Sequence, residues 1–312
     1  MTAVSTVVPA RTGLVGHPSD AFAGAVLAMP VVELAATVIV EEADGVRVGD
    51  QRFDDLSVLL ASPHKGESQL CTATVARLTS WLHEQALEPP SAGFSMTWTT
   101  TIPRAAGLAG SSALVIGALR SLAGAWNVAL PDEVGPRLAL EVETDLLGIA
   151  AGPQDRIVQW HARPMLMDFA ETPWSRRVVH PPAPIELLVC WTDAARRPSD
   201  STHAPLQQRR DDPVVREHMA ALAALARDAA DAVARGDVDA FGRCIDAGFE
   251  HRRALVDLDP AHVELVEGFR ALGAAVTYTG SGGAVVALAP DLEPLRAWAD
   301  ERALGHVTTV LA

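Results

Sequence analysis

A stretch rich in glycine and serine at residues 103–113 carries the strongest chemical signal in this sequence. It reads Pro-Arg-Ala-Ala-Gly-Leu-Ala-Gly-Ser-Ser-Ala and connects a predicted strand at Phe94–Ile102 with a predicted buried helix at Ser112–Trp126. Backbone N–H groups at a helix start lack intrahelical acceptors, and the helix dipole adds partial positive charge there. With glycines that allow close approach, such a loop can bind phosphate. An ordinary strand–turn–helix connection with serine caps is the structural alternative.

The scarcity of lysine limits the phosphate-binding motifs that the chain can contain. Lys65 is its single lysine, so it has neither a G-x-x-x-x-G-K-[ST] loop nor the V-A-I-K strand of protein kinases. The G-x-G-x-x-G fingerprint is also absent, which argues against a dinucleotide-dependent oxidoreductase. An ATP site in this chain must therefore use backbone amides and arginine.

The elements that position the loop follow from length and patterning. A chain of 312 residues corresponds to about two domains. Pro181, Pro182 and Pro184 indicate a linker, which predicts an N-terminal domain at residues 1–183 and a C-terminal domain at residues 184–312. Both halves mix helices and strands, so the predicted fold class is α+β.

Hydrophobic periodicity and capping residues predict the remaining elements. The first forty residues predict short strands at 6–10, 25–29 and 32–41 around a turn-rich stretch. Pro131–Gly148 predicts one helix with Asp132 as its cap. Other predicted strands lie at 165–169, 185–192, 274–279, 284–289 and 306–311, and other predicted helices at 68–88, 213–235, 237–256, 260–272 and 291–303.

Composition and charge argue against several classes of protein. The formal net charge of −14 leaves no excess of cations to neutralise nucleic-acid phosphates. The three cysteines lie far apart and predict neither a disulfide framework nor a C-x-x-C pair. Neither a signal peptide nor a run of about 18 apolar residues is recognised. We therefore expect a cytoplasmic protein that binds neither nucleic acid nor a membrane.

Four segments resemble motifs of the GHMP kinases, in the order in which that family has them. Residues 103–113 resemble the second motif, with one extra residue before the two serines, as in the plant-type glucuronokinases. Arg11–Asp20 resembles the first motif and Gly280–Ala284 the third, and Gly148–Arg156 is similar to the segment that carries the catalytic aspartate. Shorter similarities to the glucuronokinases lie at Met167–Phe169 and Pro198–Ser201.

The resemblance implies a two-domain fold and ATP-dependent phosphoryl transfer. The N-terminal domain would be of the ribosomal-protein-S5 type and the C-terminal domain ferredoxin-like, with ATP bound between them. Asp155 would accept the proton of the acceptor hydroxyl, and Arg11 would stabilise charge on the transferred phosphoryl group. Mg²⁺ would bind Ser112 and Glu143, with Glu141 as the alternative ligand. The residues implied for the ATP phosphates are Pro103, Gly107, Leu108, Ala109, Gly110, Ser111, Ser112 and Ala113.

The implied acceptor is a small sugar or sugar acid, with glucuronate giving glucuronate 1-phosphate as the leading case. A neutral sugar, a heptose or a mevalonate-type acceptor is an alternative, as is an inactive sugar-binding regulator on the same fold. The chain is expected to be a monomer or homodimer. Because guanidinium matches carboxylate bidentately, Arg104 or Arg156 is expected to bind the acid group. The residues implied for the acceptor are His17, Ser19, Asp20, Arg156 and Gly282.

Ordinary structural roles are the alternatives for these side chains. Asp155 could cap a helix, Arg11 could be a surface cation, and Glu143 could lie on a solvated helix face. His17 could have a structural role in its turn, and Arg156 could point along its helix into a surface ion pair.

Overall fold

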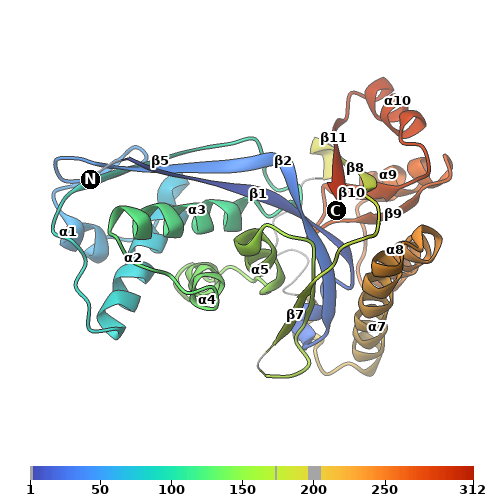
Figure 1. Cartoon of the computed structure of the whole chain (residues 1–312), viewed down its shortest axis with the longest axis horizontal. Coiled ribbons are helices and arrows are strands. Elements are labelled where there is room, and N and C mark those ends of the chain that lie inside the picture. The colour runs from blue at the N-terminus through green and yellow to red at the C-terminus, as the bar shows by residue number, and fades with distance from the viewer. Residues whose placement is uncertain (1–2, 173, 196–204) are drawn as a thin grey trace. The chain divides into compact units, whose positions relative to one another are not determined.

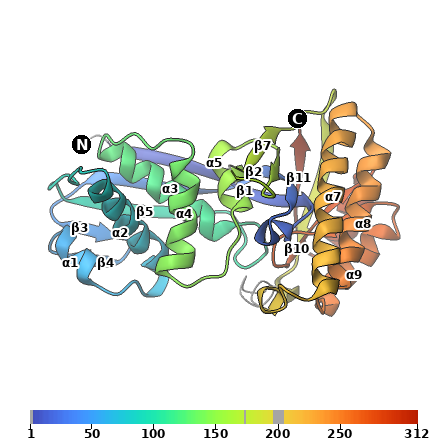
Figure 2. The same ribbon diagram turned by 90° about the horizontal axis from the view of Figure 1, so that it is seen from below.

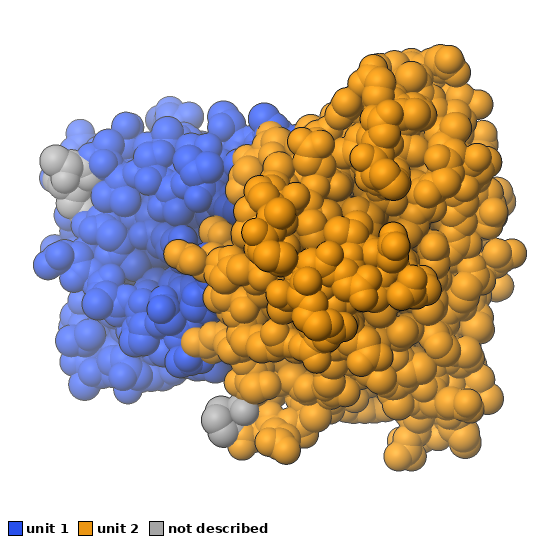
Figure 3. All heavy atoms as spheres, turned by 45° about the vertical axis from the view of Figure 1, so that its right-hand side comes forward, with its two compact units in different colours: residues 1–10, 34–102, 110–161 blue, residues 11–33, 103–109, 162–312 orange. Residues whose placement is uncertain are grey.

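The computed structural model describes residues 3–172, 174–195 and 205–312, which form two compact units (Figures 1 and 3). Unit 1 comprises residues 1–10, 34–102 and 110–161, and unit 2 comprises residues 11–33, 103–109 and 162–312. The chain therefore passes between the units several times, whereas the predicted domains 1–183 and 184–312 require one passage. In the part of the chain that the structure describes, no helix has the length and apolarity needed to span a bilayer.

Unit 1 contains strands and a group of packed helices. Its strands are the first part of β1 (Val4–Val15), the second part of β2 (Ala25–Glu42), β3 (Val46–Val48), β4 (Gln51–Phe53) and β5 (Phe94–Thr100). Its helices are α1 (Leu56–Ala61), η2 (Gly66–Ser68), α2 (Gln69–Glu84), α3 (Gly110–Ala125), α4 (Val134–Glu141), η3 (Val142–Leu146) and α5 (Gln154–His161). In this unit β2 pairs antiparallel with β5, and β3 pairs with β5 in parallel.

Helix α3 lies at the centre of the helical part of unit 1. It packs against α2, α4 and α5. Residues such as Val115, Ile116 and Leu119 are fully buried, which explains why the sequence of this helix is apolar on nearly every side. The predicted buried helix is confirmed, and its start at Gly110 places the serine pair in the first turn.

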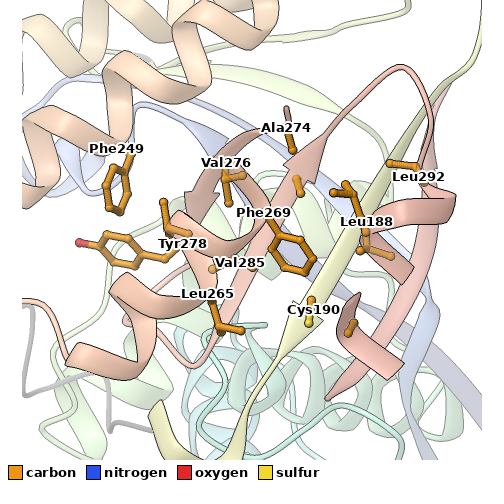
Figure 4. Close-up of a cluster of buried hydrophobic side chains, with 14 residues drawn as sticks. Leu188, Cys190, Phe249, Leu265, Phe269, Ala274, Val276, Tyr278, Val285 and Leu292 are labelled. Atoms are coloured by element: carbon orange, nitrogen blue, oxygen red, sulfur yellow. The ribbon is translucent and has the colours of Figure 1, made fainter. Parts of the chain in front are cut away.

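Unit 2 contains a four-stranded antiparallel sheet in the order β11-β8-β10-β9. Helices α7 and α8 pack against each other, as Figures 1 and 2 both show. Figure 4 shows the core of this unit, in which Leu188, Phe269 and Val285 are buried together. Besides the remaining parts of β1 and β2, the elements of unit 2 are η1 (Ser19–Phe22), β6 (Met165–Asp168), β7 (Ser175–Val178), β8 (Ile185–Trp191), η4 (Asp193–Ala195), α7 (Pro213–Arg235), α8 (Val238–Arg253), α9 (Pro260–Arg270), β9 (Ala275–Tyr278), β10 (Ala284–Leu288), α10 (Glu293–Glu301) and β11 (Gly305–Leu311).

The N-terminal region differs from its prediction. The expected turn-rich stretch after residue 10 is partly strand, because β1 continues to Val15, and the two strands predicted at 25–29 and 32–41 form one long β2. Pro30 cannot donate a ladder hydrogen bond. It lies between the stretch of β2 that pairs with β6 and the stretch that pairs with β5, so the strand continues through it.

The helix predicted at Pro131–Gly148 is shorter and irregular. It begins at Val134, and the turn Val142–Leu146 is a π-helix, a rare distortion that often occurs at functional sites. Asp132 is not its cap, because this carboxylate accepts a hydrogen bond from Trp160 Nε1 at 3.1 Å instead.

Candidate active site

The glycine-rich loop has an unusual backbone. Ala105, Gly107 and Ala109 have φ values of 56°, 72° and 60°. These left-handed conformations turn the chain before α3 begins at Gly110. Ser112, in the first turn of α3, is fully buried. The chain therefore turns tightly directly before the start of α3, and phosphate binding by this loop stays a prediction.

Gly107 contacts the third glycine-rich segment within unit 2. A Cβ atom at Gly107 would lie 2.2 Å from the carbonyl oxygen of Thr279 and 2.9 Å from that of Gly282. Both obstacles are backbone atoms, so a larger residue at this position would force the two loops apart. The second and third motifs thus meet at a contact that only glycine allows.

Arg11 links the same two loops. It is only 3% exposed, and its Nη1 donates to the Gly107 carbonyl at 3.2 Å and to Thr279 Oγ1 at 3.3 Å. The backbone N–H of Gly13 also donates to Thr279 Oγ1, at 3.2 Å. The structure therefore brings the first, second and third motifs together in unit 2, and Arg11 is not a surface cation.

The residues predicted for the acceptor are buried in the same unit. His17, Ser19 and Asp20 are at most 6% exposed. Ser19 Oγ donates to the Ala25 carbonyl at 2.9 Å, which fixes the start of η1. His17 Nε2 lies 2.9 Å from the carbonyl oxygen of Tyr278, directly before the third motif.

In unit 1, a hydrogen-bonded chain orients the Ser112 hydroxyl. Gln159 Nε2 donates to the Pro9 carbonyl at 2.8 Å, so the amide oxygen of Gln159 faces the serine. Ser112 Oγ donates to this oxygen at 2.6 Å. The amide oxygen of Gln159 therefore sets the direction in which the Ser112 hydroxyl proton points.

Two carboxylates of unit 1 share one arginine. Arg156, 3% exposed, forms an ion pair with the fully buried Glu143, and its Nη1 lies 3.6 Å from Asp155 Oδ2. Arg156 Nη1 also donates to the Gly152 carbonyl at 2.8 Å, which ties the turn to α5. Thus Arg156 is not in a surface pair, and Glu143 is not on a solvated face. The Asp155 side chain keeps 18% of its surface exposed, so of the two carboxylates it is the one that a substrate can reach.

Glu141 has a different environment from Glu143. Its carboxylate accepts hydrogen bonds from Arg77 Nε and Arg137 Nη1, each at 2.7 Å. These two bonds hold Glu141 on the helix surface. Arg104, an expected partner of the acceptor carboxylate, is exposed. The predicted motif at Pro198–Ser201 lies outside the described residues.

Sequence reasoning missed Thr279, Gln159 and Arg252. Arg252 is 2% exposed and donates from Nη2 to the Gly280 carbonyl at 2.8 Å. A signal for it existed, because Phe241, Ile245 and Arg252 occupy one face of α8 at helical spacing, and all are buried. An arginine on an apolar stripe indicates a buried cation.

Comparisons with known proteins identify the family of this chain. The family model described as GHMP kinases N terminal domain matches residues 72–163, and the model described as GHMP kinases C terminal matches residues 229–301. Glucuronokinase 1 of Arabidopsis thaliana is 30% identical over 304 residues, covering 90% of this chain and 84% of the relative. The boundary at residue 183 falls between the two matched segments but stays a prediction.

Solved structures share the fold. Streptococcus pneumoniae phosphomevalonate kinase, in complex with phosphomevalonate and AMPPNP, aligns with a TM-score of 0.81 at 15% identity, covering 98% of this chain and 99% of that one. Lactococcus lactis galactokinase complexed with galactose aligns with a TM-score of 0.77 at 17% identity, covering 99% and 93%. This chain therefore belongs to the GHMP kinase family and is an ATP-dependent phosphotransferase that acts on a hydroxyl group.

Proposed function

We propose that this enzyme transfers the γ-phosphoryl group of ATP to the anomeric hydroxyl of glucuronate, giving glucuronate 1-phosphate. The observation that carries this proposal is the similarity to two Arabidopsis thaliana proteins, Glucuronokinase 1 and Probable glucuronokinase 2, at 30% and 29% identity over 90% of the chain. The extra residue in the loop before the serine pair supports the same assignment.

The ATP phosphates are assigned to the loop and the first turn of α3. The N–H groups of a first helical turn have no intrahelical acceptors, and the dipole favours an anion there. Gly107, Leu108 and Ala109 precede this turn, and Gly110–Ala113 form it. Pro103 begins the loop. A chain with one lysine thus has a backbone site for phosphate.

The donor chemistry of unit 1 fits Mg²⁺. This cation prefers oxygen ligands, and Ser112 provides a hydroxyl oxygen that its bond to Gln159 holds in one orientation. Glu143 adds a buried carboxylate whose charge Arg156 balances in the absence of metal. We assign Ser112 and Glu143 as the ligands. Bound Mg²⁺ would neutralise charge on the β- and γ-phosphates.

Asp155 is assigned as the general base. It lies in the first turn of α5, where the helix dipole stabilises a carboxylate, and its side chain is accessible. It would accept the proton of the acceptor hydroxyl as that oxygen bonds to the γ-phosphorus, while the bond from the γ-phosphorus to the bridging oxygen breaks and ADP leaves. Arg11, already fixed by two hydrogen bonds, is assigned to stabilise negative charge on the transferred group.

The acceptor is assigned to the buried residues around η1 and the third motif. Ser19 and Asp20 provide a hydroxyl and a carboxylate that can hydrogen-bond sugar hydroxyls. Gly282 lies in the adjacent segment of unit 2, where its N–H donates to the Thr279 carbonyl at 3.1 Å. A Cβ atom at Gly282 would lie 2.1 Å from His262, so this segment also requires glycine.

A screen of ATP consumption tests the assignment directly. The purified chain is assayed with uronic acids, neutral sugars, mevalonate and homoserine. A site that pairs a buried cation with the carboxylate should prefer glucuronate to glucose by about 10²-fold or more in kcat/KM. Comparable rates with both sugars would refute the uronic-acid assignment and leave the kinase assignment intact.

A second measurement distinguishes an active kinase from an inactive sugar-binding regulator with the same fold. MgATP at about 100 times its Kd should stabilise the folded chain by about 2.7 kcal/mol and raise its Tm. A regulator would show sugar-dependent stabilisation without turnover of ATP by any acceptor. An active kinase would show both ligand-dependent stabilisation and turnover of ATP with its acceptor.

A further inference from the structure

Arg252 is a buried cation at the end of α8. Its Nη1 donates to the Tyr278 carbonyl, and its Nη2 donates to the Gly280 carbonyl at 2.8 Å. Its guanidinium also lies 3.3 Å from the centroid of the Tyr278 ring. Figure 4 shows Tyr278 beside Phe249 at one side of the core of unit 2. The side chain is therefore held by backbone carbonyls and an aromatic face.

Within the described part of the chain, the charge of Arg252 has no anionic partner. Among the described residues, no carboxylate forms an ion pair with it, and its Nε is buried without a hydrogen-bond acceptor. Burial is the main reason why the pKa of Arg252 falls to about 10, and the positive charge of Arg11 acts in the same direction. The group still carries its proton at neutral pH. A buried cation without a counter-ion is costly, and an anion bound nearby would lower that cost.

The position of Arg252 connects this charge to the acceptor residues. Its Nη1 contacts His17 Nε2, and His17 belongs to the first motif. Its bond to Gly280 fixes the beginning of the third motif. Arg252 thus touches two of the segments assigned to the acceptor. Both segments and α8 lie in unit 2.

We propose that Arg252 is a positioning residue that determines specificity, because its uncompensated charge next to His17 favours an acceptor with a carboxylate over a neutral sugar. This inference rests on the proposed function, since it explains how a uronic acid is distinguished from its parent hexose. Arg156 was the other candidate for recognising the carboxylate of the acceptor. Its guanidinium forms an ion pair with Glu143, whereas Arg252 has no such partner among the described residues.

The test compares the ratio of kcat/KM for glucuronate to that for glucose in matched variants. Arg252→Met keeps the volume and removes the charge, and it should lower the ratio by about tenfold or more. Arg253→Met is the control, because this neighbour is half-exposed and its ion pair with Glu267 spans 3.7 Å. Removing that exposed charge should change the ratio by less than about twofold. The KM for MgATP and the Tm of each variant show whether the fold is retained.

Arg252→Lys keeps the test decisive if Arg252→Met does not fold. A buried lysine loses its proton at a lower pH than arginine does. The ratio for Arg252→Lys should therefore fall between about pH 6 and about pH 9, while the ratio for the parent stays constant.

Each result decides between the two proposals. If the parent prefers glucuronate and Arg252→Met keeps that preference, or if Arg252→Lys keeps it at every pH, the role of Arg252 is overturned and the function stands. If the parent shows no preference, the uronic-acid assignment fails and the role of Arg252 fails with it.

Discussion

Replacing Gly107 by alanine tests whether the contact between the second and third motifs supports the phosphate loop. Two costs are expected. A left-handed residue with a Cβ atom costs about 1–2 kcal/mol. The clash with the Thr279 carbonyl at 2.2 Å adds a second cost, because the loops must separate. Separation weakens the hydrogen bonds that the Gly107 carbonyl accepts from Arg11 and from Thr279 Oγ1, each 3.2 Å long.

The second cost follows from the kinds of bonds involved. A hydrogen bond from a charged donor contributes about 1.5–3 kcal/mol and one from a neutral donor about 0.5–1.5 kcal/mol. Gly107→Ala should therefore destabilise the chain by roughly 3–6 kcal/mol in total. It should also raise the KM for MgATP by about tenfold, because the loop that presents N–H groups to the phosphates is displaced.

Gly273→Ala is the matched control for this prediction. Gly273 lies in unit 2 like Gly107 and has φ +84°, and a Cβ atom there would have no neighbouring heavy atom within 4 Å. Only the backbone cost of about 1–2 kcal/mol should appear there, with the KM for MgATP unchanged. Urea unfolding and initial-rate kinetics measure both variants. Equal losses of stability and equal KM values in the two variants would refute the reasoning.

Three further predictions concern single side chains. Asp155→Ala should lower kcat by about 10²–10⁴-fold with little change in the KM for MgATP, and a kcat within about threefold of the parent would remove this residue from catalysis. Glu143→Gln should raise the Mg²⁺ concentration needed for half-maximal activity, whereas Glu141→Gln, whose parent carboxylate is held by two arginines, should not; the reverse result would exchange the two assignments. Burial and then the nearby His218 lower the pKa of His251, so the unfolded state takes up a proton first and stability is lost as the pH falls below about 6.5. His251→Gln should therefore show a smaller fall in Tm between about pH 7.5 and about pH 5 than the parent, and parallel curves would contradict this.

Local signals in the sequence predicted much of the fold. Asp259 followed by Pro260 predicted the start of α9, and the Asp259 side chain accepts from the N–H of Ala261 as a cap does. The apolar run at 185–192 predicted the buried strand β8. These predictions succeed because caps and periodicity act over a few residues.

The predictions that failed concern segments in which local sequence signals conflict with the pairing of strands in the sheet. Glycine and proline near residues 11–30 indicate turns, but strand partners keep β1 and β2 extended there. No element was predicted for the hairpin of β3 and β4, whose strands are only three residues long. Short strands have little periodicity of their own, and their neighbours in the sheet determine them.

The sequence by itself determined the chemistry of the candidate site: three glycine-rich segments, one aspartate at a helix start, and arginine in place of lysine. Tertiary structure alone decided which of these groups meet. Arg11 and Thr279 are separated by 268 positions yet share a hydrogen bond, and Glu143, which lies in a π-helical turn, pairs with Arg156 of α5. The burial of Arg252 beside an exposed Arg253 was decided in the same way. The physical reason is that the sequence fixes the chemical type of each side chain. Its burial and the charges around it depend on residues that are distant in the sequence and become neighbours only when the chain folds.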